Sequence, residues 1–394
     1  MNANNKRIVL KGIGSISSLG CTSEEERENL TSGETRIRTI EIEGRECKAA
    51  PLSPSGETAL ARLAAEQPRY ADLDRSVLMA IYSARQALQQ VGWRKEECPV
   101  LVNIGSSRGS TGLFEHYHRM HVESRGSKMS PLASPTTTLG NVASWVLQDL
   151  KLCGQPLSHS VTCSTGIQAI ANGVAWLRSG MVWRALVGGS EAPLTSFTIS
   201  QMRALKVYAT ESGPLPCRPC AADPAQGTGM VLGEGAAVHA LELKEAGQGE
   251  IIVEGVGLSS ETIDSPTSIS ERGDALQTAM RAALEMAGSA SVDAVLMHAP
   301  GTPFGDTAEL AAIEEVFGED RRPMLISNKW IIGHTFGAAG SLALNYAILL
   351  LNGTRPVEFP YRTKFSNLSR PIKRVMVNAA GFGGNAGSAI IARL

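Results

Sequence analysis

One cysteine stands where a strand pattern gives way to a helix pattern. The strand pattern covers 157–162, and the helix pattern covers 164–178 with apolar side chains at a helical period. Cys163 is therefore placed at a helix N-terminus, where unpaired amide N–H groups and the helix dipole favour negative charge. Because this environment lowers the pKa of a thiol and favours the nucleophilic thiolate, the position is suited to a reactive cysteine. Position alone leaves a buried structural cysteine open as the alternative.

Two histidines have similar surroundings later in the chain. His298 follows the apolar run 294–297, and His334 lies between Gly333 and Thr335. Each histidine stands where a short strand gives way to a glycine-rich turn, which is where α/β proteins collect catalytic groups. Either histidine by itself could be a hydrogen-bonded structural residue. A helix-capping thiol together with two imidazoles, however, is a set suited to thioester chemistry.

The motifs around these residues resemble those of the β-ketoacyl synthases, the condensing enzymes of fatty acid and polyketide assembly, in their elongating Cys-His-His form. The family's cysteine motif, roughly T-A-C-S/A-T-G/S, corresponds to 161–166. Its motif H-G-T-x-T-P-x-G-D corresponds to 298–306, and K-x-x-x-G-H-T-x-G-A-A-G corresponds to 329–340. Three shorter stretches match as well: 186–191, 231–235 and 381–385.

The resemblance implies a role for each residue at the centre of the site. Cys163 attacks an acyl thioester carried by acyl carrier protein, and neutral His298 and His334 stabilise the enolate formed from the malonyl thioester. The backbone N–H groups of Cys163 and Phe382 form the oxyanion hole. Phe382 also gates the acyl chain, with backbone freedom supplied by Gly381, Gly383 and Gly384.

Four further residues support the site in the same interpretation. Lys329 is the family's motif lysine, and Glu309 stands where the family has a carboxylate. We expect a buried ion pair between them that positions the histidine loops, with a surface position for Lys329 as the alternative. Thr302 is the motif hydroxyl left to contact pantetheine, and Asp306 closes the motif. The resemblance implies no metal and no cofactor beyond the phosphopantetheine that carries the acyl and malonyl thioesters.

The expected fold is α/β. Alternating strand and helix patterns imply mostly parallel sheets covered on both faces, and the near-copies 8–14 and 251–257 indicate a duplication. The resemblance implies a thiolase-like fold, in which two duplicated α/β halves form a five-layer α-β-α-β-α arrangement. We expect the half with the cysteine over 1–248 and the half with both histidines over 249–394.

Individual elements follow from local periodicity. Helices are predicted at 76–91, 164–178, 275–287, 307–317 and 338–351. Buried strands are predicted at 100–104, 184–188, 294–298 and 374–378. The segments 30–75 and 106–140 are interpreted as insertions, and the second of these suits a dimer contact or an entrance loop. A two-fold dimer is expected, either with a second copy or with a homologue.

Composition narrows the class of protein. Apolar residues make up 43% of the 394 residues, and a formal net charge of -1 argues against nucleic acid as the main partner. The apolar segment 341–351 is too short to cross a bilayer, and the polar residues 1–7 lack an apolar signal region. Seven scattered cysteines without a disulfide framework are consistent with a reducing compartment, so we expect a cytoplasmic protein.

Two candidate metal clusters are disfavoured. Cys217 and Cys220 form a C-x-x-C in a Pro/Gly-rich loop, but no second pair accompanies it. His116, His118 and His121 have a spacing that fits no common ligand set, and they indicate a solvated surface helix.

Four departures from the family pattern indicate a divergent member. Pro300 replaces a motif threonine, and Ala343 stands where many bacterial members have glutamate. The segment 219–229 replaces the usual P-F-D-x-x-R-D-G-F, and the threonine of G-F-G-G-T-N is absent. None of these changes touches the Cys-His-His set, so they leave open the acyl chain and the choice between fatty acid and secondary-metabolite pathways.

Several related activities compete with the elongating synthase. A chain-length factor, a catalytically silent structural partner, normally lacks the nucleophile that Cys163 provides. A degradative thiolase needs a second cysteine near its C-terminus, whereas Cys220 is the last cysteine here. A starter-type synthase usually has asparagine where His334 stands. A non-enzymatic carrier-protein module would not need all three groups, so their joint presence favours the active synthase.

Overall fold

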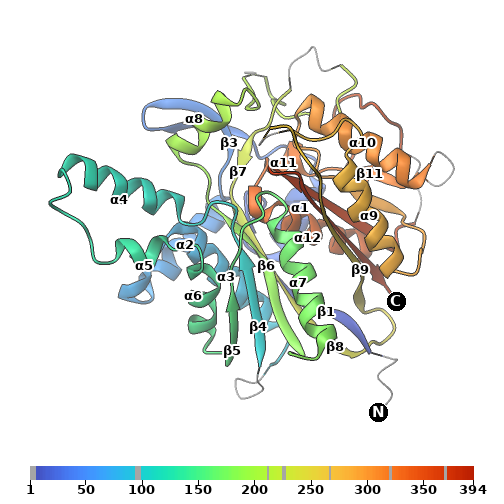
Figure 1. Cartoon of the computed structure of the whole chain (residues 1–394), viewed down its shortest axis with the longest axis horizontal. Coiled ribbons are helices and arrows are strands. Elements are labelled where there is room, and N and C mark those ends of the chain that lie inside the picture. Colours follow the sequence, from blue (N-terminus) through green and yellow to red (C-terminus); the bar gives the residue numbers. More distant parts are fainter. Residues whose placement is uncertain are drawn as a thin grey trace.

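A ten-stranded mixed sheet runs through the centre of the molecule (Figure 1). The structure, a computed structural model, describes residues 6–93, 99–210, 213–223, 228–265, 268–318, 322–367 and 371–394. The strand order is β11-β10-β12-β13-β9-β1-β8-β6-β4-β5. In chain order, the first five strands of this sheet are β1 (Lys6–Ser17), β4 (Val100–Gly105), β5 (Gly154–Leu157), β6 (Arg184–Glu191) and β8 (Gly235–Glu245). The other five are β9 (Ile251–Ser260), β10 (Ala294–Leu296), β11 (Met324–Ile326), β12 (Arg374–Gly381) and β13 (Asn385–Arg393).

The two sets of five strands repeat one arrangement. Reading outward from the centre, the orders are β1-β8-β6-β4-β5 and β9-β13-β12-β10-β11. In each set the first two pairings are antiparallel and the last two are parallel. The prediction of mostly parallel sheets was therefore wrong. A short turn, such as the one between β12 and β13, joins two adjacent strands directly, so these strands must run antiparallel.

Close packing of strand against helix explains why glycines recur in the similar segments 8–14 and 251–257. A Cβ on Gly12 or Gly14 would lie 2.3 Å from Ala87 O or 1.9 Å from Ser83 O, both in α3 (Arg75–Gln89). In the second half, a Cβ on Gly255 or Gly257 would lie 2.1 or 2.0 Å from carbonyl oxygens of α9 (Asp274–Met286). Only glycine permits this approach of strand to helix, and β1 and β9 pair with each other at the centre.

Helices cover both faces of the sheet and fill the space between its halves. The middle layer is α7 (Thr165–Ser179) and α12 (Ala339–Leu351), whose side chains share one core with strands of both halves. Two outer cores lie against α3 and α6 (Asn141–Leu150), and against α9 and α10 (Pro303–Phe317). This is the predicted five-layer, thiolase-like order. All five predicted helices are present, and α10 begins earlier than expected because Pro303 starts its first turn.

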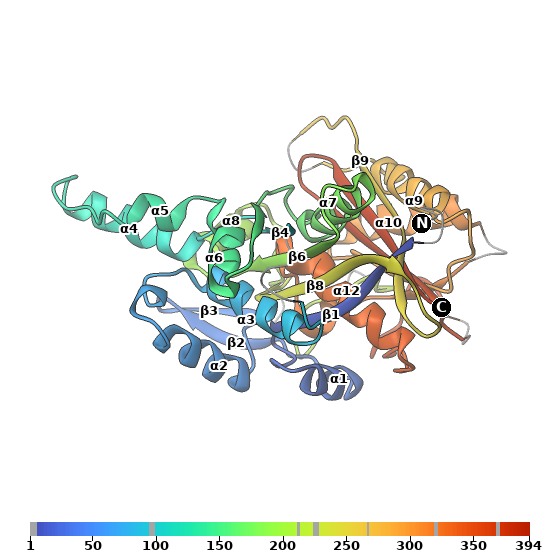
Figure 2. The same cartoon turned by 90° about the horizontal axis from the view of Figure 1, so that it is seen from below.

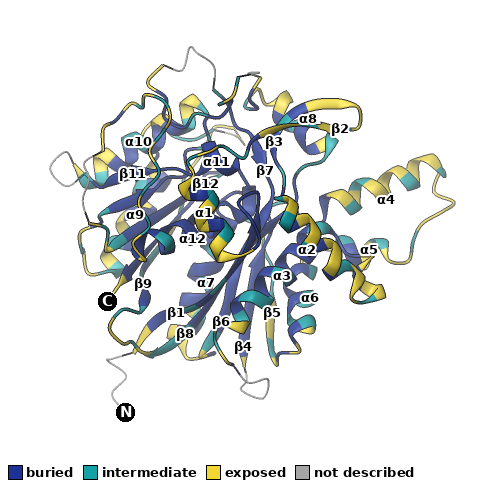
Figure 3. Ribbon diagram, turned by 180° about the vertical axis from the view of Figure 1, so that it is seen from behind, coloured by how far each residue is buried: buried dark blue, intermediate teal, exposed yellow. Residues whose placement is uncertain are grey.

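The predicted insertions lie outside the layers. The first, 30–75, contains α2 (Pro54–Ala65) and two strands of a small sheet, β2 (Arg38–Ile42) and β3 (Arg45–Ala50), and β7 (Leu232–Gly233) completes that sheet from outside the insertion. The helix α1 (Ser23–Thr31) ends where this insertion begins. The second contains α4 (Thr111–Glu123) and α5 (Ala133–Thr137), which project from the body (Figures 1 and 2). Figure 3 shows α4 largely exposed, whereas the central strands are buried.

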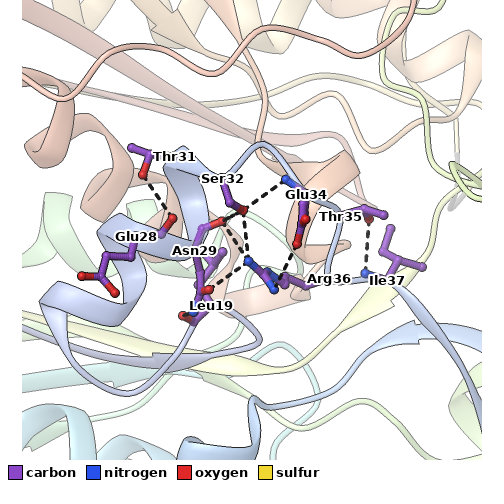
Figure 4. A network of polar contacts seen from close by, with 9 residues as sticks. All are labelled: Leu19, Glu28, Asn29, Thr31, Ser32, Glu34, Thr35, Arg36 and Ile37. Atoms are coloured by element: carbon purple, nitrogen blue, oxygen red, sulfur yellow. Dashed lines mark hydrogen bonds and ion pairs between the residues drawn. The ribbon is translucent and has the colours of Figure 1, made fainter.

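The segment after α1 is tied to a short helix of the second half, α11 (Lys329–Ile332). The Arg36 side chain donates to Asn29 Oδ1 at 2.9 Å and to Ser32 Oγ at 3.1 Å, which fixes the segment in its own network (Figure 4). Thr35 Oγ1 donates to Trp330 O at 2.7 Å, and the Arg36 amide donates to Ile331 O at 2.8 Å. The insertion therefore holds the helix on which Lys329 stands.

Candidate active site

A sharp turn presents Cys163 between β5 and α7. The strand predicted over 157–162 is wrong, because β5 ends at Leu157 and Thr162 adopts a left-handed φ of 54°. Thr165 holds the turn closed, since its hydroxyl accepts from the Val161 amide and donates to Thr162 O. A β-branched residue with positive φ is unusual and is found where the surrounding structure imposes it, often at functional sites.

The thiol of Cys163 does not have the lowered pKa that its position predicted. Burial raises the pKa to about 12, and the nearby Glu191 carboxylate adds to the rise, while Lys329 and Arg108 oppose it. Cys163 lies one residue before the helix cap Ser164, and its side chain is shielded from water. Burial therefore raises the pKa of the Cys163 thiol even though the residue stands next to a helix N-terminus.

His298 and His334 come from different loops and meet at the site. Their ring centroids are 5.0 Å apart with an interplanar angle of 87°. Burial, and then the positive charge of Lys329, lowers the pKa of His298 to about 3. Burial also places the pKa of His334 well below its usual value. Both imidazoles are therefore neutral at neutral pH, as the sequence interpretation expected.

The Glu309 carboxylate fixes the loop of His298 through hydrogen bonds to its backbone. Its two oxygens accept the amide N–H groups of His298 at 2.9 Å and Ala299 at 2.7 Å. Asn378 on β12 donates a further bond to it at 3.1 Å. The loop conformation is thus set by a buried carboxylate, whose pKa is raised by burial.

Lys329 is buried, which excludes the surface alternative, but it forms no direct ion pair with Glu309. The described ion pairs within 4.0 Å do not include these two residues, and Lys329 Nζ donates instead to Asn328 Oδ1 at 3.1 Å. The predicted contact is therefore wrong. The two charges still interact at longer range, because Glu309 opposes the burial that lowers the pKa of Lys329 to about 8. The amides of His298 and Ala299 and the Asn378 side chain occupy the carboxylate instead.

Asp306 and Thr302 lie at the start of α10. Asp306 accepts the Gly301 amide at 3.1 Å and the Cys220 amide at 2.8 Å, so it joins the histidine loop to the 217–220 loop. Burial raises the pKa of Asp306 to about 7. Thr302 is the cap residue of α10 and lines the same cavity as Pro300.

The turn between β12 and β13 packs against the nucleophile. A Cβ on Gly381 would lie 2.0 Å from Thr162 Oγ1 and 2.8 Å from the Cys163 amide nitrogen. Gly381 is thus required for close approach and not, as expected, for a positive φ, whereas Gly383 has a φ of 84°. Thr162 Oγ1 also donates to Phe382 O at 3.1 Å, which ties the two turns together.

Two cavities meet at Cys163. The first, of about 200 Å³, is lined by both histidines, Glu309, Thr302 and the 381–386 turn. The second, of about 370 Å³, is lined by residues of the 106–115 segment and α8 (Ser196–Ala204). Cys163, Phe336 and Phe382 line both cavities. The structure thereby brings the predicted nucleophile, both histidines and the predicted gate together where these two separate cavities adjoin.

Sequence reasoning gave no role to two residues beside the nucleophile. Glu191 is buried at the end of β6 and accepts four bonds, from the amides of Ser107, Arg108 and Gly337 and from Ser106 Oγ. Phe336 stacks edge to face on His334 with centroids 5.4 Å apart. A glutamate at the end of a mainly apolar strand pattern was the available signal for Glu191. Nothing in the local pattern marked Phe336.

The residues of the two candidate metal clusters lie in different parts of the fold. Cys217 and Cys220 are buried, and Cys217 Sγ lies 3.5 Å from Pro300 O, so the C-x-x-C packs beneath the histidine loop. His116, His118 and His121 lie on the exposed helix α4. Across the described ranges, no group of three or more His, Cys, Asp or Glu residues is arranged to hold a metal ion.

The departures from the family pattern lie at and behind the cavity. Pro300 lines the first cavity, and Ala343 is buried within α12. Of the segment 219–229, residues 224–227 lie outside the described residues.

No helix in the described part of the chain has the length and apolar character needed to span a bilayer.

Two family models match the chain in sequence. The model for "Beta-ketoacyl synthase, N-terminal domain" matches residues 5–246, and "Beta-ketoacyl synthase, C-terminal domain" matches residues 251–356. The 3-oxoacyl-[acyl-carrier-protein] synthase 2 of Rhizobium meliloti (strain 1021) is 29% identical over 418 residues, covering 98% of this chain and 99% of that protein. Nodulation protein E of Rhizobium sp. (strain N33) is 29% identical over 374 residues, covering 91% of this chain and 89% of that protein.

Solved structures share the fold. A β-ketoacyl synthase from Burkholderia phymatum STM815 superposes with a TM-score of 0.83 at 25% identity, covering 99% of this chain and all of that one. The ishigamide ketosynthase/chain length factor superposes with a TM-score of 0.85 at 23% identity, with coverage of 99% and 100%.

Proposed function

Because the chain belongs to the β-ketoacyl synthase family, we propose that it condenses an acyl thioester with malonyl-acyl carrier protein, with loss of carbon dioxide. The product is a β-ketoacyl thioester on the carrier, formed in fatty acid or polyketide biosynthesis. The observation that carries the proposal is the meeting of Cys163, His298 and His334 around one cavity. The neutral state of both imidazoles supports it, because each can donate an N–H to a developing oxyanion.

In the first half-reaction, the sulfur of Cys163 attacks the acyl carbonyl. A C–S bond forms to Cys163, the C–S bond to the carrier breaks, and the thiol proton ends on the departing phosphopantetheine sulfur. The carbonyl oxygen carries the charge of the tetrahedral intermediate, and we assign its stabilisation to the backbone N–H groups of Cys163 and Phe382. The packing of Gly381 on the Cys163 amide supports this assignment, since it brings both turns together.

In the second half-reaction, malonyl-carrier enters the first cavity and its carboxylate leaves as carbon dioxide. The electron pair of the broken C–C bond forms an enolate, whose oxygen accepts N–H bonds from His298 and His334. The enolate carbon then attacks the acyl carbonyl on Cys163. The C–S bond breaks, which releases the β-ketoacyl product and leaves a Cys163 thiolate that takes up a proton from water to restore the thiol. Glu309 and Lys329 act as positioning residues, Glu309 through the amides of the His298 loop.

The experiment follows the two half-reactions separately. Intact-protein mass spectrometry reports acyl transfer to the enzyme, and release of labelled carbon dioxide from malonyl-carrier reports decarboxylation. Cys163→Ser should abolish acylation, whereas Cys153→Ser, at an exposed cysteine, should leave it unchanged. Acylation that persists in Cys163→Ser would overturn the proposed nucleophile. A chain-length factor is not favoured, because it normally lacks the nucleophile that Cys163 provides.

We further propose a two-fold dimer that uses the face of α4 and α8. Phe114 and Phe197 are 61% and 56% exposed there, which is unusual for phenylalanine and supports a covered interface. The partner is a second copy or a homologous chain, and light scattering with and without co-expressed homologues distinguishes them.

We also propose a domain division at 248/249, a cytoplasmic location, and no cofactor beyond carrier-bound phosphopantetheine.

A further inference from the structure

The second cavity beside Cys163 carries charge where an acyl chain would lie. It is lined by two charged side chains, Arg108 and Glu115, and by the hydroxyl-bearing residues Ser107, Thr111 and Thr162. Its apolar lining comes from Phe114, Phe197, Met202, Phe336 and Phe382. The histidines line only the first cavity. The two sides of the nucleophile therefore differ in chemistry.

Arg108 is held firmly in this lining. Its backbone amide donates to Glu191 at 3.1 Å, and its Nη1 donates to Gln201 Oε1 on α8 at 2.7 Å. The guanidinium carbon lies 5.6 Å from the centroid of the Phe336 ring. A guanidinium has five N–H donors, so the bond to Gln201 leaves donors for a ligand. A polar group held in place by its neighbours is suited to selecting a ligand.

Glu115 adds a hydrogen-bond acceptor to the lining of the second cavity. Its Oε1 atom is buried and has no hydrogen-bond partner among the described residues. Glu115, Phe114 and Phe197 also line an adjoining groove of about 660 Å³ that reaches Glu43 and Arg119. The second cavity thus adjoins the α4 and α8 face that we propose as the dimer contact, so a chain longer than the cavity would extend toward that contact.

We propose that the second cavity holds the acyl chain on Cys163 and selects chains that bear oxygen, with Arg108 as the specificity-determining donor. The ligand class is an acyl thioester with a carbonyl or hydroxyl group along its chain. This inference rests on the proposed function. A saturated chain would remove Arg108 and Glu115 from water without offering hydrogen bonds, which costs roughly tenfold or more in reactivity for each unpaired group.

The test compares chains of equal length on the full-length protein. Cys163 acylation is followed by mass spectrometry with acetyl, octanoyl and a set of octanoyl thioesters carrying one keto group at C3, C5 or C7. We expect at least one keto chain to react roughly tenfold faster than octanoyl. Arg108→Met should reverse that preference, and Arg108→Lys should retain part of it. Arg281→Met, an exposed arginine on α9, is the matched control and should leave the preference unchanged.

The outcomes separate this inference from the proposed function. Normal acylation by acetyl and octanoyl, with no preference for any keto chain or no effect of Arg108→Met on it, would overturn the inference alone. The absence of acylation by every thioester would overturn the proposed function and the inference with it. Light scattering and thermal unfolding of Arg108→Met show that the variant keeps its assembly and fold, and Arg108→Lys repeats the comparison with a cation retained.

Discussion

His298 and His334 face one another edge to face, with ring centroids 5.0 Å apart and planes at 87°. Burial keeps both rings uncharged, and the positive Lys329 further disfavours a second cation there. Two neutral imidazoles can each direct one N–H into the same small volume. This relationship suits the stabilisation of a single enolate oxygen, and it requires no protonated histidine.

The first prediction concerns these histidines. His298→Ala and His334→Ala should each lower malonyl decarboxylation by about 10²–10³, because each removes one donor to the enolate oxygen. Acyl transfer to Cys163 should fall much less, since neither ring is assigned to that step. Carbon dioxide release and the mass of the acyl-enzyme measure the two reactions. His121→Ala on the exposed α4 is the control, and decarboxylation at the parent rate in both active-site variants would contradict the assignment.

The second prediction concerns Glu191 and the thiol of Cys163. Because the carboxylate contributes to raising the pKa of Cys163, Glu191→Gln should lower that pKa. The pH profile of Cys163 alkylation, followed by peptide mapping, should therefore move to lower pH in the variant. A purely structural role would lower the thermal midpoint without moving the profile. Glu314→Gln, at an exposed position on α10, is the control, and an unmoved profile for Glu191→Gln would refute the electrostatic role.

The sequence predicted the layers better than the strand directions. Helix periodicity located α3, α7, α9, α10 and α12 to within a few residues, because the buried residues of α3, α7 and α9 recur at a helical period and α12 is an almost wholly apolar run. Pairing direction depends instead on how distant strands are joined. The antiparallel contact of β1 with β9 joins residues more than 240 positions apart, and periodicity carries no information about it.

The sequence motifs predicted that Cys163 and both histidines lie together and that the histidines are neutral, but they did not predict the raised pKa of the thiol. The structure places the three residues around one cavity. The pKa of the thiol was wrong because the helix N-terminus is a local feature, whereas burial depends on the whole fold. The direct Glu309–Lys329 contact was wrong for a similar reason. Backbone N–H groups donate hydrogen bonds to the Glu309 carboxylate, and the positions of backbone N–H groups cannot be predicted from residue types.

The third prediction concerns stability and pH. Burial raises the pKa of Asp306 from its ordinary 3.8 to about 7, so the native state binds more protons than the unfolded state between these values. The free energy of unfolding should therefore fall as pH rises from about 4 to 7, by at most about 1.4 kcal/mol per pH unit for this group. Asp306→Asn should make that slope shallower in urea titrations. Asp274→Asn, at the exposed start of α9, should not, and an unchanged slope for Asp306→Asn would show that another carboxyl sets it.

The last prediction concerns Phe382, which lines both cavities and stands in the β12–β13 turn that Thr162 ties to the turn of the nucleophile. Phe382→Ala would join the space of about 200 Å³ to that of about 370 Å³ and remove an aromatic contact with Cys163 and Phe336. We expect acylation to become less selective for chain length and condensation to slow, because the acyl chain and the malonyl group would no longer be kept apart. Phe382→Leu, which retains bulk, should preserve most of the selectivity, and light scattering should show the same assembly for all three proteins. Acylation rates across acetyl to dodecanoyl thioesters provide the measurement. If Phe382→Ala retains the parent selectivity and condensation rate, the ring packs beside the nucleophile without gating it.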